Sequence, residues 1–434
     1  MREVRATFHN SVNQGTRQIF MASLVVIVLV LLTTNAPYAY SAPLSSSLRD
    51  SCGHTFHRPT SYFARHFDTT FMKRIAGHLN PFTSAAPVRM RFFLYKSDFA
   101  ECGREIITND YSSLQMSEFN AKHPTRIIIH GWMSKSKGAL NRLLTKAYLS
   151  LVKRVPAPTV SDSHSDIADY PMPIININDD NNNNNDGSYR SYVNNTTTNT
   201  PNDYNVIICD WTPTSSNVNY FAVADMVKDV GHLLAEFVKF LHLRADLDYN
   251  DVYLIGHSLG AQIAGSAGKQ SYPFRFNTIF ALDPAGPKFR DQSPENRIDA
   301  SDAEYVESIQ TSSSFGFKKP LGHAAFYPNY GHSQKKCYFY GCSHKRAYHY
   351  FAESITSKLG FWGVPCRRTS NGLWIFTQTA VGARMGGEPS LPKNGTFYVK
   401  TADQPPYALG PTILSQQMVI PAIDEASNEN LFEM

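Results

Sequence analysis

The sequence lacks several features that would place it in other classes of protein. Its 41 Lys and Arg residues nearly balance 36 Asp and Glu residues, and they form no dense basic run. The net charge of +5 is too small to indicate nucleic-acid binding, so we predict no nucleic-acid partner. No internal repeat is visible. With 42% hydrophobic and 18% charged residues, the composition is that of a globular protein with a core.

The chain also lacks an apolar run of the roughly 20 residues that a membrane-spanning helix needs. Its apolar run near the N-terminus, Ile19–Leu32, is shorter, and three arginines precede it while small residues follow it. This pattern predicts a secretory signal peptide over residues 1–41, cleaved between Ala36 and Ala42, with Met21 as an alternative start. A membrane anchor is the alternative. We therefore expect a secreted, extracellular protein.

Cysteine is scarce as well, and the six residues are Cys52, Cys102, Cys209, Cys337, Cys342 and Cys366. Disulfides are expected in an oxidising compartment. Cys337 and Cys342 are near enough in the sequence to pair across a tight turn, and Cys52 with Cys102 is a second candidate pair. Cys209 lies in an apolar run and is expected to be a buried free thiol. The last cysteine has no evident partner.

One segment differs in composition from the rest of the chain. Residues 155–202 are rich in Asn, Asp, Ser and Thr, so they cannot bury enough apolar surface to fold. We interpret them as a disordered insertion in a domain that spans 89–410, preceded by an extension at 42–88 and followed by a tail at 411–434. Acceptor sites for N-glycosylation are present at Asn194, Asn195 and Asn394.

Strand-like and helix-like segments alternate on both sides of this insertion. Runs of β-branched residues predict buried strands, and apolar residues at helical spacing predict amphipathic helices. The expected strands are 126–132, 204–211, 251–257 and 276–283, and the expected helices are 139–152, 220–241 and 258–268. This alternation predicts an α/β fold with a mainly parallel central sheet.

The segment Gly256-His257-Ser258-Leu259-Gly260 matches G-x-S-x-G, the sequence of a nucleophile elbow. The match is informative because an expected strand leads into it and a helix of small residues follows it. The glycines permit a sharp turn, and the serine at the helix N-terminus is a candidate nucleophile. An ordinary Gly/Ser turn before a helix is the alternative.

A serine nucleophile needs a histidine base that a carboxylate orients, in the chain order Ser, acid, His. Asp283 closes an expected strand and is the candidate acid, with a turn-forming Asp-Pro as the alternative. The candidate bases are His323, His332, His344 and His349. His344 stands out because the expected disulfide next to it would hold it in place. The residues alone leave this choice open.

An oxyanion formed during the reaction needs two backbone N–H donors. One is expected from Leu259, the residue after the nucleophile. The other is expected from Trp132, in the turn that follows an earlier strand and that Gly131 permits.

Taken together, these motifs resemble the pancreatic-lipase family of secreted α/β-hydrolases, particularly insect-type lipases and phospholipases A1. The segments that carry the resemblance, between Arg89 and Leu409, are IIIHGW, DYNVIICDW, GHSLGAQIAG, FALDPAGP, GHAAFYPNYG and CSHKRAYHYFAESI. The resemblance implies Ser258 as the nucleophile, Asp283 as the acid and His344 as the base, with Trp132 and Leu259 as the oxyanion donors.

The resemblance also implies that the residues between Cys337 and Cys342 form the lid over the active site. Only Tyr338-Phe339-Tyr340-Gly341 are present there, which is too few to cover a cleft of lipid size. Because the loop is so short, we expect a permanently open site with little activation by an oil–water interface. Within the family, such reduced lids look like those of phospholipases A1. The aromatic tip either touches a membrane surface or acyl chains, or merely packs.

The sequence departs from the family pattern in four respects. No C-terminal β-sandwich domain is expected, and Gln310-Thr311 replaces a His-Thr pair of the family. The partner that the family implies for Cys366 is missing. The segment that holds structural calcium in some members matches only in part, with Arg297, Asp299 and Asp302. Calcium could bind there, but solvated acids in a loop are the commoner alternative.

We predict a secreted serine carboxylic-ester hydrolase that acts on lipids through an acyl-serine, as a phospholipase A1 or a short-lid lipase, with no required cofactor. The expected partner is a lipid substrate or a membrane surface. A triacylglycerol or galactolipid lipase is one alternative. Another is a non-catalytic lipid-binding or storage protein like the insect yolk proteins, which lose the triad serine. Ser258 is present here, which favours an enzyme.

Overall fold

The computed structural model describes residues 48–53, 55–56, 88–152, 201, 203–369, 372–377 and 382–411. The predicted signal peptide, Asn194, Asn195 and nearly all of the Asn-rich insertion and the tail lie outside the described residues. Within the described ranges, none of the helices combines the length and the apolar character that crossing a membrane requires.

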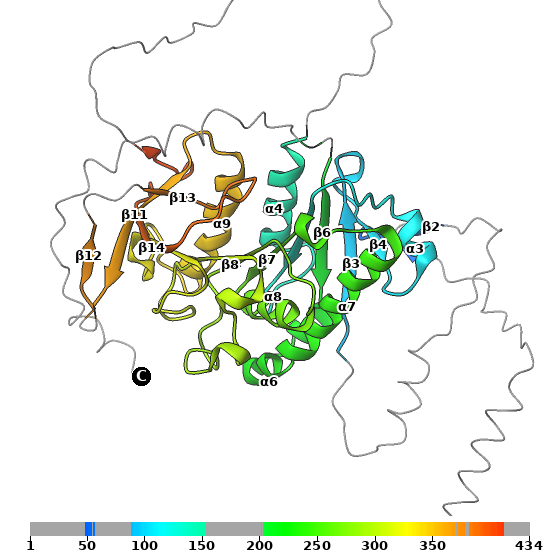
Figure 1. The fold of residues 1–434 in the computed structure, drawn as a ribbon, viewed down its shortest axis with the longest axis horizontal. Coiled ribbons are helices and arrows are strands. Elements are labelled where there is room, and N and C mark those ends of the chain that lie inside the picture. Colours follow the sequence, from blue (N-terminus) through cyan, green and yellow to red (C-terminus); the bar gives the residue numbers. More distant parts are fainter. Residues whose placement is uncertain are drawn as a thin grey trace, which may run out of the picture. The chain divides into compact units, whose positions relative to one another are not determined.

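A twelve-stranded sheet forms the centre of the fold (Figure 1). Its strands are β3 (Arg91–Tyr95), β4 (Arg104–Ile106), β5 (Thr125–Ile129), β6 (Asn205–Asp210), β7 (Val252–His257), β8 (Thr278–Leu282), β9 (Tyr305–Ile309), β10 (Ala324–Pro328), β11 (Phe361–Arg368), β12 (Trp374–Phe376), β13 (Ala383–Met385) and β14 (Gly395–Val399). The central strands are parallel in the order β6-β5-β7-β8-β9-β10-β14. Antiparallel strands extend the sheet at both edges, β3 and β4 at one and β11 to β13 at the other. A separate antiparallel pair joins β1 (Leu48–Arg49) and β2 (Thr55–Phe56).

Helices connect the strands and cover the sheet. They are α3 (Tyr111–Met116), α4 (Ala139–Leu149), α5 (Thr212–Ser215), α6 (Tyr220–Asp225), α7 (Val227–Ala245), α8 (Leu259–Gln270) and α9 (Cys342–Thr356). Short 3-10 helices lie at Ser97–Phe99, Tyr249–Asp251, Pro294–Asn296, Ala300–Asp302 and Asn329–Gly331. Figure 1 shows α4 and α9 on one side of the sheet and α7 and α8 on the other.

Both faces of the sheet are buried, which explains the uninterrupted apolar strands of the sequence. Along β5, Ile127 and Ile129 pack into the core under α7 and α8, whereas Ile128 packs into the core under α4 and α9. The side chains alternate because successive residues of a strand point to opposite faces. A mainly parallel sheet between two layers of helices confirms the predicted α/β fold.

The predicted elements are present, with one correction. The single helix expected over 220–241 is two helices, α6 and α7, separated at Met226. The Met226 N–H bonds the carbonyl of Val223, three residues back, which tightens the last turn of α6. Cys209 in β6 is a fully buried free thiol, as predicted, and Cys366 in β11 is also free and buried.

Candidate active site

Ser258 lies between the carboxyl end of β7 and the start of α8, at the edge of the sheet where the parallel strands end. Its backbone has a φ of 58° and a ψ of −123°, which a residue with a side chain adopts only under strain. Such strain at a strand-to-helix turn is the local geometry of a nucleophile elbow. The residues on both sides are buried, whereas Ser258 is partly exposed. The turn therefore leaves Ser258 accessible from solvent while its neighbours in the chain are buried.

Two glycines make this turn sterically feasible. A Cβ on Gly256 would lie 2.3 Å from the carbonyl oxygen of Gly260, and a Cβ on Gly260 would lie 2.1 Å from that of Ile129. Both distances are far below van der Waals contact, so any larger residue would push α8 away from the sheet. Close packing of helix and strands therefore requires both glycines of the motif.

Asp283 directly follows β8 and is fully buried. Its Oδ1 accepts the backbone N–H groups of Thr311, at 2.8 Å, and Ser312, at 3.1 Å. Its Oδ2 lies 2.6 Å from Nδ1 of His344. Because Thr311 contacts the acid through its backbone, the departure at Gln310-Thr311 leaves this contact intact, and the Gln310 side chain bonds a different loop.

All four candidate histidines are in the described part of the chain, and within it only His344 contacts Asp283. His323 accepts the backbone N–H of Val306 at 3.0 Å through Nδ1. His332 is exposed, and His349 packs beside an aromatic ring of α9. The geometry therefore separates His344 from the three histidines that sequence reasoning left open.

Burial controls the charge of the His344–Asp283 pair. It lowers the pKa of the His344 imidazole well below its usual value, and the charge of Lys345 acts in the same direction. The imidazole is therefore neutral near pH 7, the form that accepts a proton. Burial raises the pKa of Asp283, while the N–H donors of Thr311 and Ser312 oppose the rise. With Nδ1 donating to Asp283, Nε2 of His344 is left to accept a proton.

His257, which sequence reasoning did not single out, joins the elbow to α9. Its Nε2 lies 3.0 Å from the carbonyl oxygen of His344, and the two rings are 4.4 Å apart. A carbonyl can only accept, so His257 donates from Nε2. Burial lowers the pKa of His257 to about 3 and keeps it neutral. The residue before the candidate nucleophile thus anchors the backbone of the candidate base.

The predicted oxyanion donors lie close to Ser258. A Cβ on Gly131 would be 2.8 Å from the Cβ of Ser258, so the turn that carries Trp132 packs against the elbow. Leu259 begins α8. Within the described residues, neither backbone N–H of Trp132 or Leu259 donates a hydrogen bond, so both are available to a ligand. The indole of Trp132 is fixed by a 2.7 Å bond to the carbonyl of Asn217.

The disulfide Cys337–Cys342 closes a short loop at the start of α9, as the sequence predicted. Its aromatic residues Tyr338, Phe339 and Tyr340 are 83%, 83% and 92% exposed. The ring of Tyr340 also lies edge-on to that of Phe315, at 4.7 Å. These aromatics are surface groups rather than part of the core.

Phe315 connects this loop to the candidate base, a contact that no sequence motif signalled. Its ring lies 4.7 Å from that of Tyr340, edge-on, and 5.0 Å from the imidazole of His344, nearly parallel. The same turn includes Ser312, whose N–H bonds Asp283. One loop after β9 therefore contacts Asp283, His344 and the disulfide loop.

The two acids that matched a calcium segment, Asp299 and Asp302, are already paired with cationic side chains. The fully buried carboxylate of Asp302 bonds the ammonium group of Lys269 and accepts the N–H of Asp299 at 2.8 Å. Arg297 lies 3.6 Å from the carboxylate of Asp299. Calcium at this segment stays a prediction.

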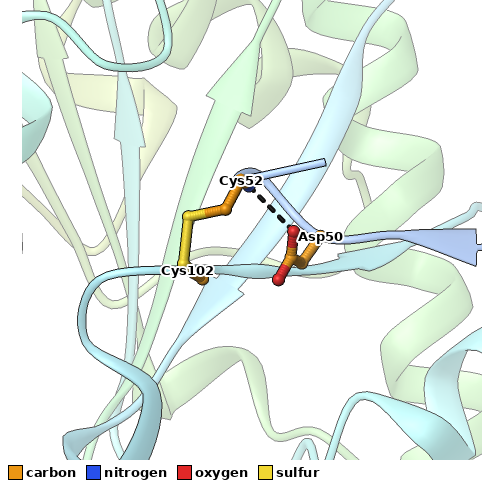
Figure 2. Close-up of side chains that lie close together, drawn as sticks. All are labelled: Asp50, Cys52 and Cys102. Atoms are coloured by element: carbon orange, nitrogen blue, oxygen red, sulfur yellow. Dashed lines mark hydrogen bonds between the residues drawn. A yellow bond between two sulfur atoms is a disulfide. The ribbon is translucent and has the colours of Figure 1, made fainter. Parts of the chain in front are cut away.

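One group of potential metal ligands converges among the described residues: Asp50, Cys52 and Cys102 (Figure 2). The two sulfurs are bonded to each other at 2.05 Å, and a carboxylate oxygen of Asp50 accepts the Cys52 N–H at 2.9 Å. The cluster is therefore the second predicted disulfide, and its sulfurs are not free to bind a metal.

Comparison with known proteins identifies relatives. The family model Lipase matches residues 67–407. A phospholipase A1 from Vespa velutina is 36% identical over 221 residues, which cover 48% of this chain and 73% of that protein. The pancreatic triacylglycerol lipase of Mus musculus is 28% identical over 366 residues, which cover 75% of this chain and 66% of that protein. The solved α/β hydrolase MGS-M1 from a deep-sea metagenome has 11% identity and a TM-score of 0.25, covering 54% of this chain and 69% of that chain, so the fold is assigned from the sheet and the family instead.

The family model covers most of the chain, including the sheet, the elbow at Ser258 and the loop before His344. The mainly parallel sheet and the strand-turn-helix at the serine are those of an α/β-hydrolase. The chain therefore belongs to the lipase family, whose members are α/β-hydrolases that cleave lipid esters.

Proposed function

We propose that the protein is a secreted phospholipase A1-type enzyme that cleaves the sn-1 acyl ester of phospholipids. The observation that carries this proposal is the loop between Cys337 and Cys342, which is too short to close over a substrate. A site without a cover leaves room for a bulky polar head group above the scissile ester. The similarity to a Vespa phospholipase A1 supports the same substrate class.

The proposed mechanism uses an acyl-serine intermediate. Ser258 attacks the acyl carbonyl while His344 takes its proton at Nε2, and Asp283 stabilises the imidazolium that forms. The backbone N–H groups of Trp132 and Leu259 bind the oxyanion. His344 then gives the proton to the leaving lysophospholipid. In the second half, His344 activates a water molecule that hydrolyses the acyl-serine.

Secretion is part of the proposal. Two disulfides, Cys52–Cys102 and Cys337–Cys342, suit an oxidising compartment. The glycosylation acceptor Asn394 is exposed in a loop before β14, as a glycosylated asparagine must be. The short apolar run at the N-terminus supplies the signal that such a route needs.

A triacylglycerol lipase is the second candidate, because the alignment with a pancreatic triacylglycerol lipase covers 75% of this chain. The two candidates share the acyl-serine chemistry and differ in the group left on the product. An uncovered site does not sequester an oil-soluble substrate from water, so it favours the phospholipid.

The deciding experiment is hydrolysis of a phosphatidylcholine and a triacylglycerol by the purified protein, side by side, with Ser258→Ala as the control. Release of the sn-1 fatty acid from the phospholipid, lost in the variant, is the expected result. Preference for triacylglycerol would retain the mechanism and overturn the substrate. No hydrolysis of either, together with no labelling of Ser258 by a fluorophosphonate probe, would favour a lipid-binding protein.

A further inference from the structure

The aromatic tip of the lid is built to stay exposed. Tyr338, Phe339 and Tyr340 follow one another in a loop that a disulfide closes, so they cannot fold back into the core. Three consecutive exposed aromatic rings are costly in water and are typical of a surface that meets an apolar partner. Tyrosine rings in particular suit the boundary between water and lipid, because one end is apolar and the other is polar.

This tip stands at the candidate active site. Tyr340 contacts Phe315, and Phe315 stacks on the imidazole of His344. A surface that receives the tip is therefore brought to the residues that would cleave an ester. The position distinguishes the tip from an aromatic turn elsewhere on the protein.

A second group of exposed apolar side chains lies near the elbow at Ser258, whereas the aromatic tip lies near His344. Val218 is 80% exposed, Phe221 is 62% exposed and Met133 is 54% exposed. Met133 follows Trp132 in the turn that packs on Ser258, and its N–H bonds the carbonyl of Ser215 just before this group. Apolar surface is thus present beside both the candidate nucleophile and the candidate base.

The stretch of sequence that includes the disulfide loop has basic but no acidic residues. From Ser308 to Ala352 the chain has no Asp or Glu, and its basic residues there are Lys318, Lys319, Lys335, Lys336, Lys345 and Arg346. Lys336 and Lys345 flank the disulfide loop and are exposed. Lys336 lies 3.1 Å from Asp403, a half-exposed pairing that water weakens. Exposed lysines beside an aromatic tip complement a negatively charged lipid surface.

We propose that Tyr338, Phe339, Tyr340, Lys336 and Lys345 form a docking surface for anionic phospholipid bilayers. The inference rests on the proposed phospholipase function and adds the kind of membrane that the enzyme selects. The aromatic rings insert at the level of the head groups, and the two lysines lie against anionic head groups around them. Docking in this way delivers an acyl ester to Ser258 without a moving lid.

The test measures binding apart from hydrolysis. Full-length Ser258→Ala protein is sedimented with vesicles of phosphatidylcholine alone and with vesicles that also contain phosphatidylserine. Tighter binding to the mixed vesicles is expected, and raising the salt concentration should remove the difference because the Debye length shortens. Equal binding to both vesicles at low salt would overturn the proposal.

Paired lysine variants locate the effect. In the Ser258→Ala background, Lys336→Ala with Lys345→Ala should weaken binding to the mixed vesicles by roughly fivefold to 30-fold. The matched control replaces two other exposed lysines, Lys146 in the last turn of α4 and Lys358 just after the end of α9, with alanine. It changes the net charge equally. Its binding should stay near that of the parent. If both pairs of substitutions weakened vesicle binding equally, only the net charge would matter, and the proposed docking surface would be wrong.

Aromatic variants test the other half of the surface. Replacing Tyr338, Phe339 and Tyr340 together with serine should weaken binding to both kinds of vesicle, since ring insertion does not depend on lipid charge. Thermal unfolding of each variant checks that the fold is retained. Unchanged binding by a folded triple variant would overturn the role of the tip.

The outcomes for docking and for the proposed function are distinguishable. Anionic selectivity of the Ser258→Ala protein, with no phospholipid hydrolysis by the parent enzyme, would support the docking surface and refute the phospholipase. Hydrolysis of phospholipid in detergent micelles, without selectivity in the vesicle assay, would support the phospholipase and refute the docking surface.

Discussion

Nδ1 of His344 lies 2.6 Å from Oδ2 of Asp283, although 61 positions separate the two residues in the sequence. The histidine stands in the first turn of α9, and the acid follows β8. Two backbone N–H groups hold the other oxygen of the acid. The carboxylate is therefore fixed in orientation before any substrate arrives, which is what an orienting acid requires.

Asp283→Asn should lower kcat for a soluble short-chain ester by about 10⁴-fold. The amide still offers an oxygen to Thr311 and Ser312, but its NH₂ group would face Nδ1 of His344 and favour the wrong tautomer. Steady-state kinetics on the folded variant measures the effect. Glu307→Gln changes a fully buried acid elsewhere in the sheet and serves as the control. Loss of less than about tenfold would remove Asp283 from the proposed mechanism.

The charge state of His344 predicts the acidic side of the pH profile. Burial and Lys345 lower the pKa of His344 below its usual 6.5, so the neutral base persists as the pH falls and activity is lost only below 6.5. The dependence of kcat/KM on pH, with a soluble ester, measures this limb. Lys345→Gln should move the limb toward higher pH, and Lys358→Gln should not. A limb above 6.5 would contradict the buried neutral imidazole.

The two disulfides should differ in their effects on stability and on activity. Cys52–Cys102 closes a loop with a sequence separation of 50, and Cys337–Cys342 closes one of 5. The chain entropy of the unfolded state then predicts that removing Cys52–Cys102 lowers the free energy of unfolding by about 4 kcal/mol. Removing Cys337–Cys342 should lower it by about 2 kcal/mol. Activity should fall more when Cys337–Cys342 is removed than when Cys52–Cys102 is removed, because Cys337–Cys342 lies beside His344.

Variants in which both cysteines of one bridge are replaced with serine test whether one bridge matters more for stability and the other for activity. Urea unfolding gives the stability, and kcat on a soluble ester gives the activity of the folded fraction. If removing Cys337–Cys342 left kcat unchanged, the bridge would have no part in placing His344.

Sequence reasoning found the features that depend on local chemistry. The elbow at Ser258 and the strand before Asp283 are visible because glycine, serine and aspartate stand at fixed positions beside β-branched runs. Cys52 and Cys102 were paired correctly from the secretory context. For the elbow and the strand, neighbouring residues along the chain carry the whole signal, whereas the pairing of Cys52 with Cys102 joins residues 50 positions apart.

The remainder depends on contacts between distant segments. His257, Phe315 and the backbone of Thr311 reach the His344–Asp283 pair through the folded sheet, and no spacing along the chain signals such contacts. The choice of His344 over three other histidines needed either the fold or the family resemblance. Only β5, β6, β7 and β8 were predicted among the strands of the central sheet. Of the others, β11 to β13 are short or mix buried with exposed residues, which weakens a strand pattern.

A buried ion pair far from the site offers a separate test of stability. Arg126 of β5 and Glu388, 262 positions apart, have side chains only 4% and 5% exposed, with Nε of the arginine 3.1 Å from the carboxylate. The guanidinium also lies 3.6 Å above the ring of Tyr253. Burial opposes its charge, but the carboxylate of Glu388 outweighs burial and raises the pKa of Arg126. The arginine therefore stays charged and depends on its partner.

Glu388→Gln should lower the free energy of unfolding by about 3–5 kcal/mol, because it leaves the buried charge of Arg126 unpaired. Replacing both residues with methionine should recover much of that loss, since two apolar side chains leave no charge uncompensated. Urea unfolding measures both variants. The activity of the folded fraction should not change, because Arg126 lies at the start of β5 and the Ser258 turn packs beyond its other end. If the single variant were as stable as the parent, the pair would contribute nothing to the fold, and the buried charge would have another partner.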